Sequence, residues 1–195
     1  MMQVEYPEGA TPLDPDEIDG LLLTHITTSG ELDRWEQDNI LHALDWLERA
    51  KPREIVSETF VRQLHKHMFG DVWKWAGEFR QREKNIGVPW WRISTDLRAL
   101  FGDVEWWHDH KTYAADELAV RFHHRLVSIH AFHNGNGRHA RLMADLLIEN
   151  AFGSPRFTWG GRDLSKSSTA RSRYLDALRA ADQSDYAPLL EFPRS

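Results

Sequence analysis

The stretch "HAFHNGNGRHAR" at residues 130–141 decides how the chain is organised. It places a Gly-Asn-Gly turn directly before two arginines that are three positions apart. Glycine and asparagine tolerate positive φ, and successive turns of this kind aim backbone N–H groups into one concavity. A helix is predicted to begin near Arg138, and its N-terminus would add free N–H groups and partial positive charge. The stretch therefore predicts an anion pocket suited to a phosphate or a diphosphate.

Three side chains around this turn suggest what the pocket does. Arg138 and Arg141 share one helix face, and guanidinium groups bind phosphate oxygens in a forked geometry. His130 lies on the other side of the turn, and its ordinary pKa of about 6.5 lets it accept a proton near neutral pH. Each feature alone is commonly a plain turn, a surface arginine or a helix-end histidine. Their combination points to phosphoryl or nucleotidyl transfer to a hydroxyl group.

Apolar spacing outside this stretch predicts an all-α protein. Ser57 is a candidate N-cap and Gly70 a candidate stop for one helix, and Asp116 is a candidate N-cap for another. The segment 78–94, "EFRQREKNIGVPWWRIS", has no helical period and is broken by glycine and proline, so we expect a short β-hairpin or flap there. The predicted helices cover approximately residues 31–50, 57–69, 95–104, 116–129, 138–150 and 174–181.

Composition limits the classes of function. The 195 residues fit one domain, and the formal net charge of −6 gives no sign of direct nucleic-acid binding. No cysteine is present, which excludes disulfides and thiolate metal sites. No apolar run reaches the roughly 18 residues of a membrane span. We therefore expect a cytoplasmic protein without a membrane partner, in which residues 1–30 are a lead-in segment.

The motif at 130–141 resembles the signature of the Fic (Fido) family, H-P-F-x-[D/E]-G-N-G-R-x-x-R. The matching residues are His130, Phe132, Gly135, Asn136, Gly137, Arg138 and Arg141. The resemblance extends over residues 31–192, through "WAGEFR…NIGVPWWRI" at 75–93 and "RSRYLDALRAADQSDYAPLLEF" at 171–192. The segment "THITTSGELDRWEQDNI" at 24–40 is also similar to a bacterial Fic subgroup called mobile mystery protein B.

This resemblance implies a helical bundle with a β-hairpin flap over the active site. It also implies transfer of AMP from ATP to a Ser, Thr or Tyr hydroxyl of a target protein, with release of pyrophosphate. His130 would be the general base, and Phe132 would anchor the loop in the core. The anion hole and the grip on the triphosphate would be formed by Gly135, Asn136, Gly137, Arg138 and Arg141.

The flap residues implied to dock the target are Ile86, Gly87, Val88, Trp90 and Trp91. The alternative interpretation of the two tryptophans is that they lie at the edge of the core. A regulatory or antitoxin-like partner and a homodimer are further expectations.

Two residues depart from the signature. Ala131 replaces a proline, which leaves the chemistry unchanged. Asn134 replaces the Asp or Glu that is the magnesium ligand of the family. An amide oxygen carries no formal charge, so affinity for Mg²⁺ or Mn²⁺ should fall and activity could be weak, shifted to another divalent ion, or absent.

Glu36 is the candidate for an inhibitory glutamate. Many Fic proteins carry [S/T]-x-x-x-E-[G/N], whose glutamate pairs with the second signature arginine, here Arg141. This chain has Leu32 and Gln37 at the flanking motif positions. The alternative interpretation is an ordinary exposed helix glutamate.

Three other functions stay open beside AMP transfer. The first is another Fic chemistry, either phosphotransfer or removal of AMP. The second, favoured by Asn134, is a non-catalytic nucleotide-binding regulator. The third is a metal-dependent hydrolase, suggested by 11 histidines. Histidines at i, i+1 and i, i+2 on a helix do not face one another, so solvated or capping roles are expected for "HKH" at 65–67, "HDH" at 108–110 and the pair His123 and His124.

Overall fold

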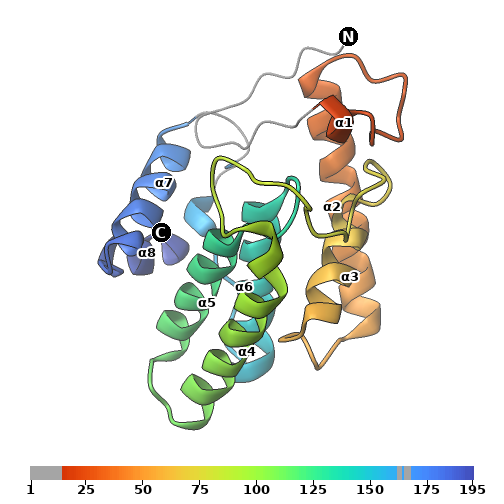
Figure 1. The fold of residues 1–195 in the computed structure, drawn as a ribbon. Coiled ribbons are helices and arrows are strands. Elements are labelled where there is room, and N and C mark those ends of the chain that lie inside the picture. The colour runs from red at the N-terminus through yellow and green to blue at the C-terminus, as the bar shows by residue number, and fades with distance from the viewer. Residues whose placement is uncertain (1–14, 162–163, 165–167) are drawn as a thin grey trace.

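The computed structural model describes residues 15–161, 164 and 168–195. Helices account for most of this part of the chain, and the all-α prediction is confirmed (Figure 1). The α-helices are α1 (Pro15–Ile18), α2 (Ser29–Ala50), α3 (Glu58–Phe69), α4 (Ile93–Asp109), α5 (Ala115–Ile129), α6 (Asn136–Phe152), α7 (Thr169–Asp182) and α8 (Ala187–Glu191). Short 3-10 turns are η1 (Trp90–Arg92), η2 (Trp159–Gly161) and η3 (Phe192–Arg194).

Local signals explain where the first long helices begin. Thr28 caps α2: its hydroxyl accepts from the Glu31 N–H at 3.3 Å, and its own N–H donates to the Glu31 carboxylate at 3.1 Å. Such a cap stabilises a helix by about 1 kcal/mol. Ser57 caps α3 as predicted, and Gly70 ends it. Asp116 is not a cap, because α5 begins at Ala115 and Asp116 already lies in its first turn.

The helices α5 and α6 form the centre of the molecule. They pack against each other, with α4 beside α5, the α2–α3 pair on one side and the α7–α8 pair on the other (Figure 1). One face of this central pair contributes to a core shared with α2, α3 and α4, and includes Phe122, Leu126 and Met143. The opposite face contributes to a second core with α7 and α8, and includes Val120 and Ile148. The turn between α5 and α6 is therefore held on both flanks by buried apolar contacts.

The segment 78–94 is present as a flap, but it is not a hairpin. No strand pairs with another inside it, and it leads through η1 into α4. Its base makes one isolated antiparallel bridge, between Phe79 and Phe132, which ties it to the α5–α6 turn. The amide groups of Arg80 and Val88, which a hairpin would pair within the flap, donate instead to the carbonyls of Ala131 and Ile129.

The described part of the predicted lead-in segment packs on the domain. Leu21 forms a bridge with Trp73, and Ile26 belongs to the core. Residues 1–14 of that segment lie outside the described residues. Within the described ranges, every helix is too short or too polar for a membrane span.

Candidate active site

His130 is the C-cap residue that directly follows α5. Its backbone is left-handed, with φ of 53°, and its N–H caps the helix by donating to Leu126 O at 3.3 Å. The residue is 6% exposed. Burial, followed by the positive charges of Arg80 and Lys84, lowers the pKa of His130 to about 4. The imidazole is therefore neutral at pH 7 and has a lone pair available to accept a proton.

Phe132 lies two residues further on and is 1% exposed. Its ring stacks on His65 with 3.7 Å between centroids and lies 5.3 Å from Phe79. The buried side chain of Asn136 accepts from the Phe132 N–H and donates to the Phe132 carbonyl, both at 2.9 Å. Each such bond contributes about 1 kcal/mol, and the pair closes the turn into one rigid unit. The Asn136 side chain thus holds the loop, while only its backbone N–H is placed to face an anion.

The two glycines of the turn have different physical roles. Gly135 has φ of +77°, and an added Cβ would lie 2.6 Å from the ring of Phe69, so both conformation and space require glycine. Gly137 shows no such internal constraint, because an added Cβ would be 3.7 Å from Arg141 and 3.9 Å from Tyr174. Gly137 lies in the first turn of α6, whose leading N–H groups have no intrahelical acceptor. This combination fits close approach of a phosphate group.

Arg138 is held by the residue predicted as the inhibitory candidate. One nitrogen of Arg138 lies 2.7 Å from Glu36 Oε2, and the guanidinium covers the ring of Phe69 at 4.8 Å. Glu36 is 5% exposed, so the interpretation as an exposed helix glutamate is wrong. Its other carboxylate oxygen accepts from the indole N–H of Trp73 at 2.6 Å.

The predicted partner of Glu36 was also wrong. The ion pair forms with Arg138, the first signature arginine, and not with Arg141. Arg141 instead lies 5.4 Å from the ring of Tyr174, and its charge opposes the rise in the pKa of Asp145, which burial raises to about 6. The physical reason for the different partner is position: α2 and Trp73 bring the carboxylate to the start of α6, beside Arg138, whereas Arg141 faces α7.

Asn134 offers little to a metal ion. Its side-chain oxygen already accepts from the Gly135 N–H at 2.6 Å, and its carbonyl is bonded to His65 at 3.0 Å. Among the described residues, no group of three or more His, Asp, Glu or Cys side chains comes together as a metal site. The protein atoms here do not fit a dedicated magnesium site, because a hard divalent cation needs several oxygen ligands.

The flap residues divide into two sets. Ile86, Trp90 and Trp91 point outward, with 44%, 42% and 64% exposure. Gly87 and Val88 instead lie against the C-terminal end of α5: Val88 donates to Ile129 O at 3.3 Å, and a Cβ on Gly87 would be 2.6 Å from Cβ of His130. The two tryptophans are thus not core-edge residues, and their rings meet edge to face at 5.8 Å on the surface.

A cluster that the sequence did not indicate joins α1 to both the flap and the turn. Glu17, 5% exposed, places one carboxylate oxygen 2.5 Å from His133 and the other 2.5 Å from Lys84. No periodicity or motif marks a glutamate in the acidic N-terminal segment as a partner of residues so far along the chain. Arg80 was missed as well. The solvated or capping role expected for His65 was wrong, because this histidine is buried in helical phase with Val61 and Phe69 on α3.

The histidine pairs that suggested a hydrolase are dispersed. His108 and His110 are exposed, as expected for solvated residues. The expectation was wrong for the buried ones: His123 is bonded to Tyr174 and His124 to Asp182, each joining α5 to α7. These side chains connect helices and do not converge on a common point.

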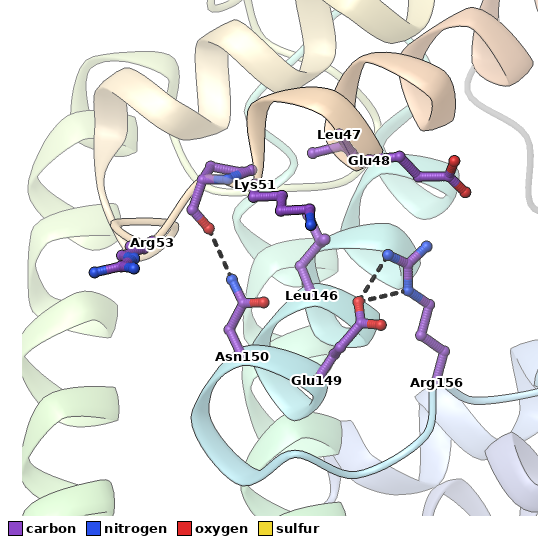
Figure 2. Close-up of a pocket in the computed structure, with 9 residues that line it drawn as sticks. Leu47, Glu48, Lys51, Arg53, Leu146, Glu149, Asn150 and Arg156 are labelled. Carbon is purple, nitrogen blue, oxygen red and sulfur yellow. Dashed lines mark hydrogen bonds and ion pairs between the residues drawn. The ribbon is translucent and has the colours of Figure 1, made fainter.

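A separate cleft of about 820 Å³ lies away from the signature residues, between the C-terminal ends of α2 and α6 (Figure 2). Figure 2 shows Arg156 turned toward Glu149, with nitrogen–oxygen distances of 2.7 and 2.9 Å, and Asn150 donating to the carbonyl of Pro52. None of its lining residues belongs to the turn or the flap. We therefore assign the chemistry to the α5–α6 turn and not to this cleft.

Comparison with known proteins is consistent with this geometry. The sequence profile of the Fic/DOC family matches residues 55–148, which include the flap and the whole turn. The probable protein adenylyltransferase y4lH of Sinorhizobium fredii is 29% identical over 174 residues, covering 85% of this chain and 84% of the relative. The protein adenylyltransferase Fic of Aedes aegypti is 28% identical over 136 residues, covering 68% of this chain. The chain spans only 26% of the length of that insect relative.

A solved structure shares the fold. The BepC protein of Bartonella tribocorum, a VirB-translocated effector crystallised with AMPPNP, superposes with a TM-score of 0.65 at 19% sequence identity. The match covers 97% of this chain and 93% of the effector chain. At this level of identity the likeness establishes the architecture of the helices.

Proposed function

We propose that this chain, which matches the Fic/DOC family over residues 55–148, is a protein adenylyltransferase, which moves AMP from ATP to a hydroxyl side chain of a target protein. One observation carries the proposal. The same rigid turn holds a neutral, buried imidazole at the end of α5 and an open helix N-terminus at the start of α6. The first group can accept a proton and the second can bind phosphate, which are the two requirements of nucleotidyl transfer.

The proposed reaction is an in-line displacement at the α-phosphorus of ATP. The hydroxyl oxygen of the target forms a bond to that phosphorus, and the bond to the oxygen bridging the α- and β-phosphates breaks. Pyrophosphate leaves, and the hydroxyl proton passes to the imidazole of His130. A general base of this kind accelerates such a step about 10²–10⁴-fold.

The phosphates would be bound by backbone and arginine groups together. The first N–H groups of α6, at Asn136, Gly137 and Arg138, lie at the helix end where the helix dipole favours negative charge. Arg138 and Arg141 supply the charge for the neighbouring phosphates. The effector from Bartonella tribocorum was solved with AMPPNP, an ATP analogue, which supports ATP as the nucleotide.

A divalent cation would be held mainly by the nucleotide itself. Asn134 stands at the signature position that would supply the metal ligand. Its amide oxygen is neutral and already accepts a hydrogen bond from the Gly135 N–H. Mg²⁺ retains several waters and commonly binds through substrate phosphates. Titration of the transfer rate with Mg²⁺ and with Mn²⁺ distinguishes the two ions. No step of the proposed reaction is assigned to a metal.

The ion pair between Glu36 and Arg138 suggests that the proposed enzyme is restrained at rest. With Arg138 held 2.7 Å from a buried carboxylate, its charge is largely neutralised before ATP arrives. The same observation, together with Asn134, favours a second function: a catalytically weak nucleotide-binding regulator. From the sequence we also propose a regulatory or antitoxin-like partner, a homodimer, and membership of the mobile mystery protein B subgroup.

A double-label experiment separates the candidate chemistries. ATP labelled on the α-phosphate and ATP labelled on the γ-phosphate are incubated in parallel with the protein and a cell lysate. AMP transfer labels protein only from the α-labelled nucleotide, whereas phosphotransfer labels protein only from the γ-labelled one. Binding of both nucleotides without protein labelling would favour the regulator.

A further inference from the structure

Arg80 is a buried cation whose guanidinium, among the described residues, is hydrogen-bonded to backbone carbonyls and to no carboxylate. It lies at the base of the flap and is 1% exposed. Burial lowers its pKa, and Glu83 partly opposes that shift by its charge. A guanidinium that is removed from water at this depth must have its donors satisfied by protein atoms. The identity of those acceptors indicates what the residue does.

The guanidinium of Arg80 donates to three backbone carbonyls. Its Nε bonds to the carbonyl of His130 at 2.7 Å, and one Nη bonds to the carbonyl of Arg82 at 2.9 Å. The other Nη bonds to the carbonyl of Val88. Arg82 and Val88 lie on the two arms of the flap, so one side chain joins both arms to the catalytic residue. The backbone N–H of Arg80 adds a fourth bond, to the carbonyl of Ala131 at 3.0 Å.

This bonding supports a strained backbone at the catalytic position. His130 has φ of 53° and ψ of 59°, a left-handed conformation that costs a non-glycine residue about 1 kcal/mol or more. Such a conformation persists only when its surroundings hold it. The bond from Arg80 to the His130 carbonyl fixes the peptide that follows the residue, and Gly87 packs against its Cβ from the flap side.

We propose that Arg80 is a positioning residue for the transfer reaction: it joins the flap to the catalytic loop and holds the imidazole of His130 in its reactive place. This inference rests on the proposed function. Displacing a catalytic group by about 1 Å can reduce a rate roughly 100-fold. The bonds of Arg80 do not reach α6, so the phosphate-binding groups keep their places when Arg80 is changed.

The charge of Arg80 gives the proposal a second, independent readout. The cations facing His130 are Arg80 and Lys84, both from the flap segment, and Lys84 is paired with Glu17 of α1. Removing the charge of Arg80 removes one cause of the low pKa of His130, so that pKa should rise toward 6.5. Burial, the larger cause, remains in place.

Two variants separate geometry from charge. Arg80→Lys keeps the charge but cannot bond to three carbonyls in a fork, and Arg80→Gln removes the charge as well. We expect both to lower kcat about 10–100-fold with KM for ATP within about twofold of the parent. Only Arg80→Gln should shift the acid limb of the plot of kcat against pH, by on the order of 0.5–1 pH unit toward higher pH. Arg98→Gln, at an exposed arginine on α4, removes the same charge and should change neither quantity.

The shift is also measured by NMR titration of His130 in the absence of ATP, which reports on Arg80 even if the parent transfers nothing. A parent without transfer activity contradicts the proposed function, whereas an unmoved His130 titration in Arg80→Gln contradicts the inference. If the arginine variants do not fold, Gly87→Ala tests the same junction, because its Cβ would lie 2.8 Å from an Nη of Arg80 and 2.6 Å from Cβ of His130. An unchanged kcat in folded Arg80→Lys, or in Gly87→Ala, would overturn the positioning role.

Discussion

The carboxylate of Glu36 lies 2.7 Å from the guanidinium of Arg138, and both groups are largely withdrawn from solvent. The side chain of Glu36 is 7% exposed and that of Arg138 is 23% exposed. A sheltered pair of this kind is stronger than a surface pair, which contributes about 0–1 kcal/mol. The arginine that we propose binds the phosphates is therefore already paired with a carboxylate in the structure.

Replacing Glu36 with glutamine should release Arg138. The amide of Glu36→Gln keeps an acceptor for the Trp73 indole but removes the negative charge, so ATP should bind about tenfold more tightly. Auto-labelling should rise in the same variant. Calorimetric titration with ATP measures the first effect.

The matched control is Asp38→Asn, which removes one negative charge from an exposed position of the same helix. Glu31 is unsuitable as a control because it completes the capping box of α2. Equal ATP affinity in the parent and in Glu36→Gln would mean that Glu36 is not a brake.

The identity of that pair shows what the sequence could and could not reveal. Local rules located the Ser57 cap, the Gly70 stop and the turn between α5 and α6, since these depend on neighbouring residues. The motif marked Glu36 and Arg138 separately, but the sequence assigned Glu36 to Arg141. Which arginine a carboxylate reaches depends on how α2 packs, and that is a tertiary property.

The same reason explains the residues that were missed. Glu17 meets Lys84 and His133 only because three distant segments converge. Arg80 lies in a segment read as a hairpin, where an arginine is normally exposed. The hairpin itself was not found because the flap uses part of its backbone bonding capacity on residues 129–131.

Trp90 and Trp91 should contribute to target docking and little to stability. Both are exposed, so replacing them with serine should change the free energy of unfolding by about 0.5 kcal/mol or less. Labelling of a target protein should fall several-fold, while auto-labelling is retained. Trp106→Ser, at another exposed tryptophan, is the control. Parallel loss of both activities together with a lower melting temperature would instead indicate a structural role.

Asn134→Asp should restore a charged oxygen ligand at the turn. The new carboxylate can still accept from the Gly135 N–H, so the loop is retained. We expect transfer to reach half its maximum at a several-fold lower Mg²⁺ concentration. The measurement is a magnesium titration at saturating ATP, repeated with manganese. Gln63→Glu, which adds one negative charge at an exposed position of α3, is the control; identical curves for both variants would exclude metal binding at the turn.

Stability should fall steeply below pH 6.5. Burial lowers the folded-state pKa of His65, His123, His130 and His139, so the unfolded chain binds protons first as pH falls. Their stabilising contribution is therefore complete above about pH 6.5 and is lost progressively below it. Asp145 acts oppositely, because its folded pKa is raised to about 6 and protonation there favours the folded state.

The net effect is a loss of up to about 4 kcal/mol per pH unit below pH 6. Urea unfolding at pH 7, 6 and 5 measures it. A midpoint that stays constant from pH 7 to pH 5 would show that these histidines are not held neutral by burial.

The central claim is that His130 is the base that accepts the hydroxyl proton during AMP transfer. The most direct measurement compares the parent with His130→Ala. ATP labelled on the α-phosphate gives the rate at which label enters protein, and a binding titration gives the Kd for ATP. We expect a rate lower by about 10²–10⁴-fold and an ATP affinity within about twofold, because in the proposed mechanism the phosphates bind α6 and its arginines and not His130. Equal labelling by the two proteins would contradict it.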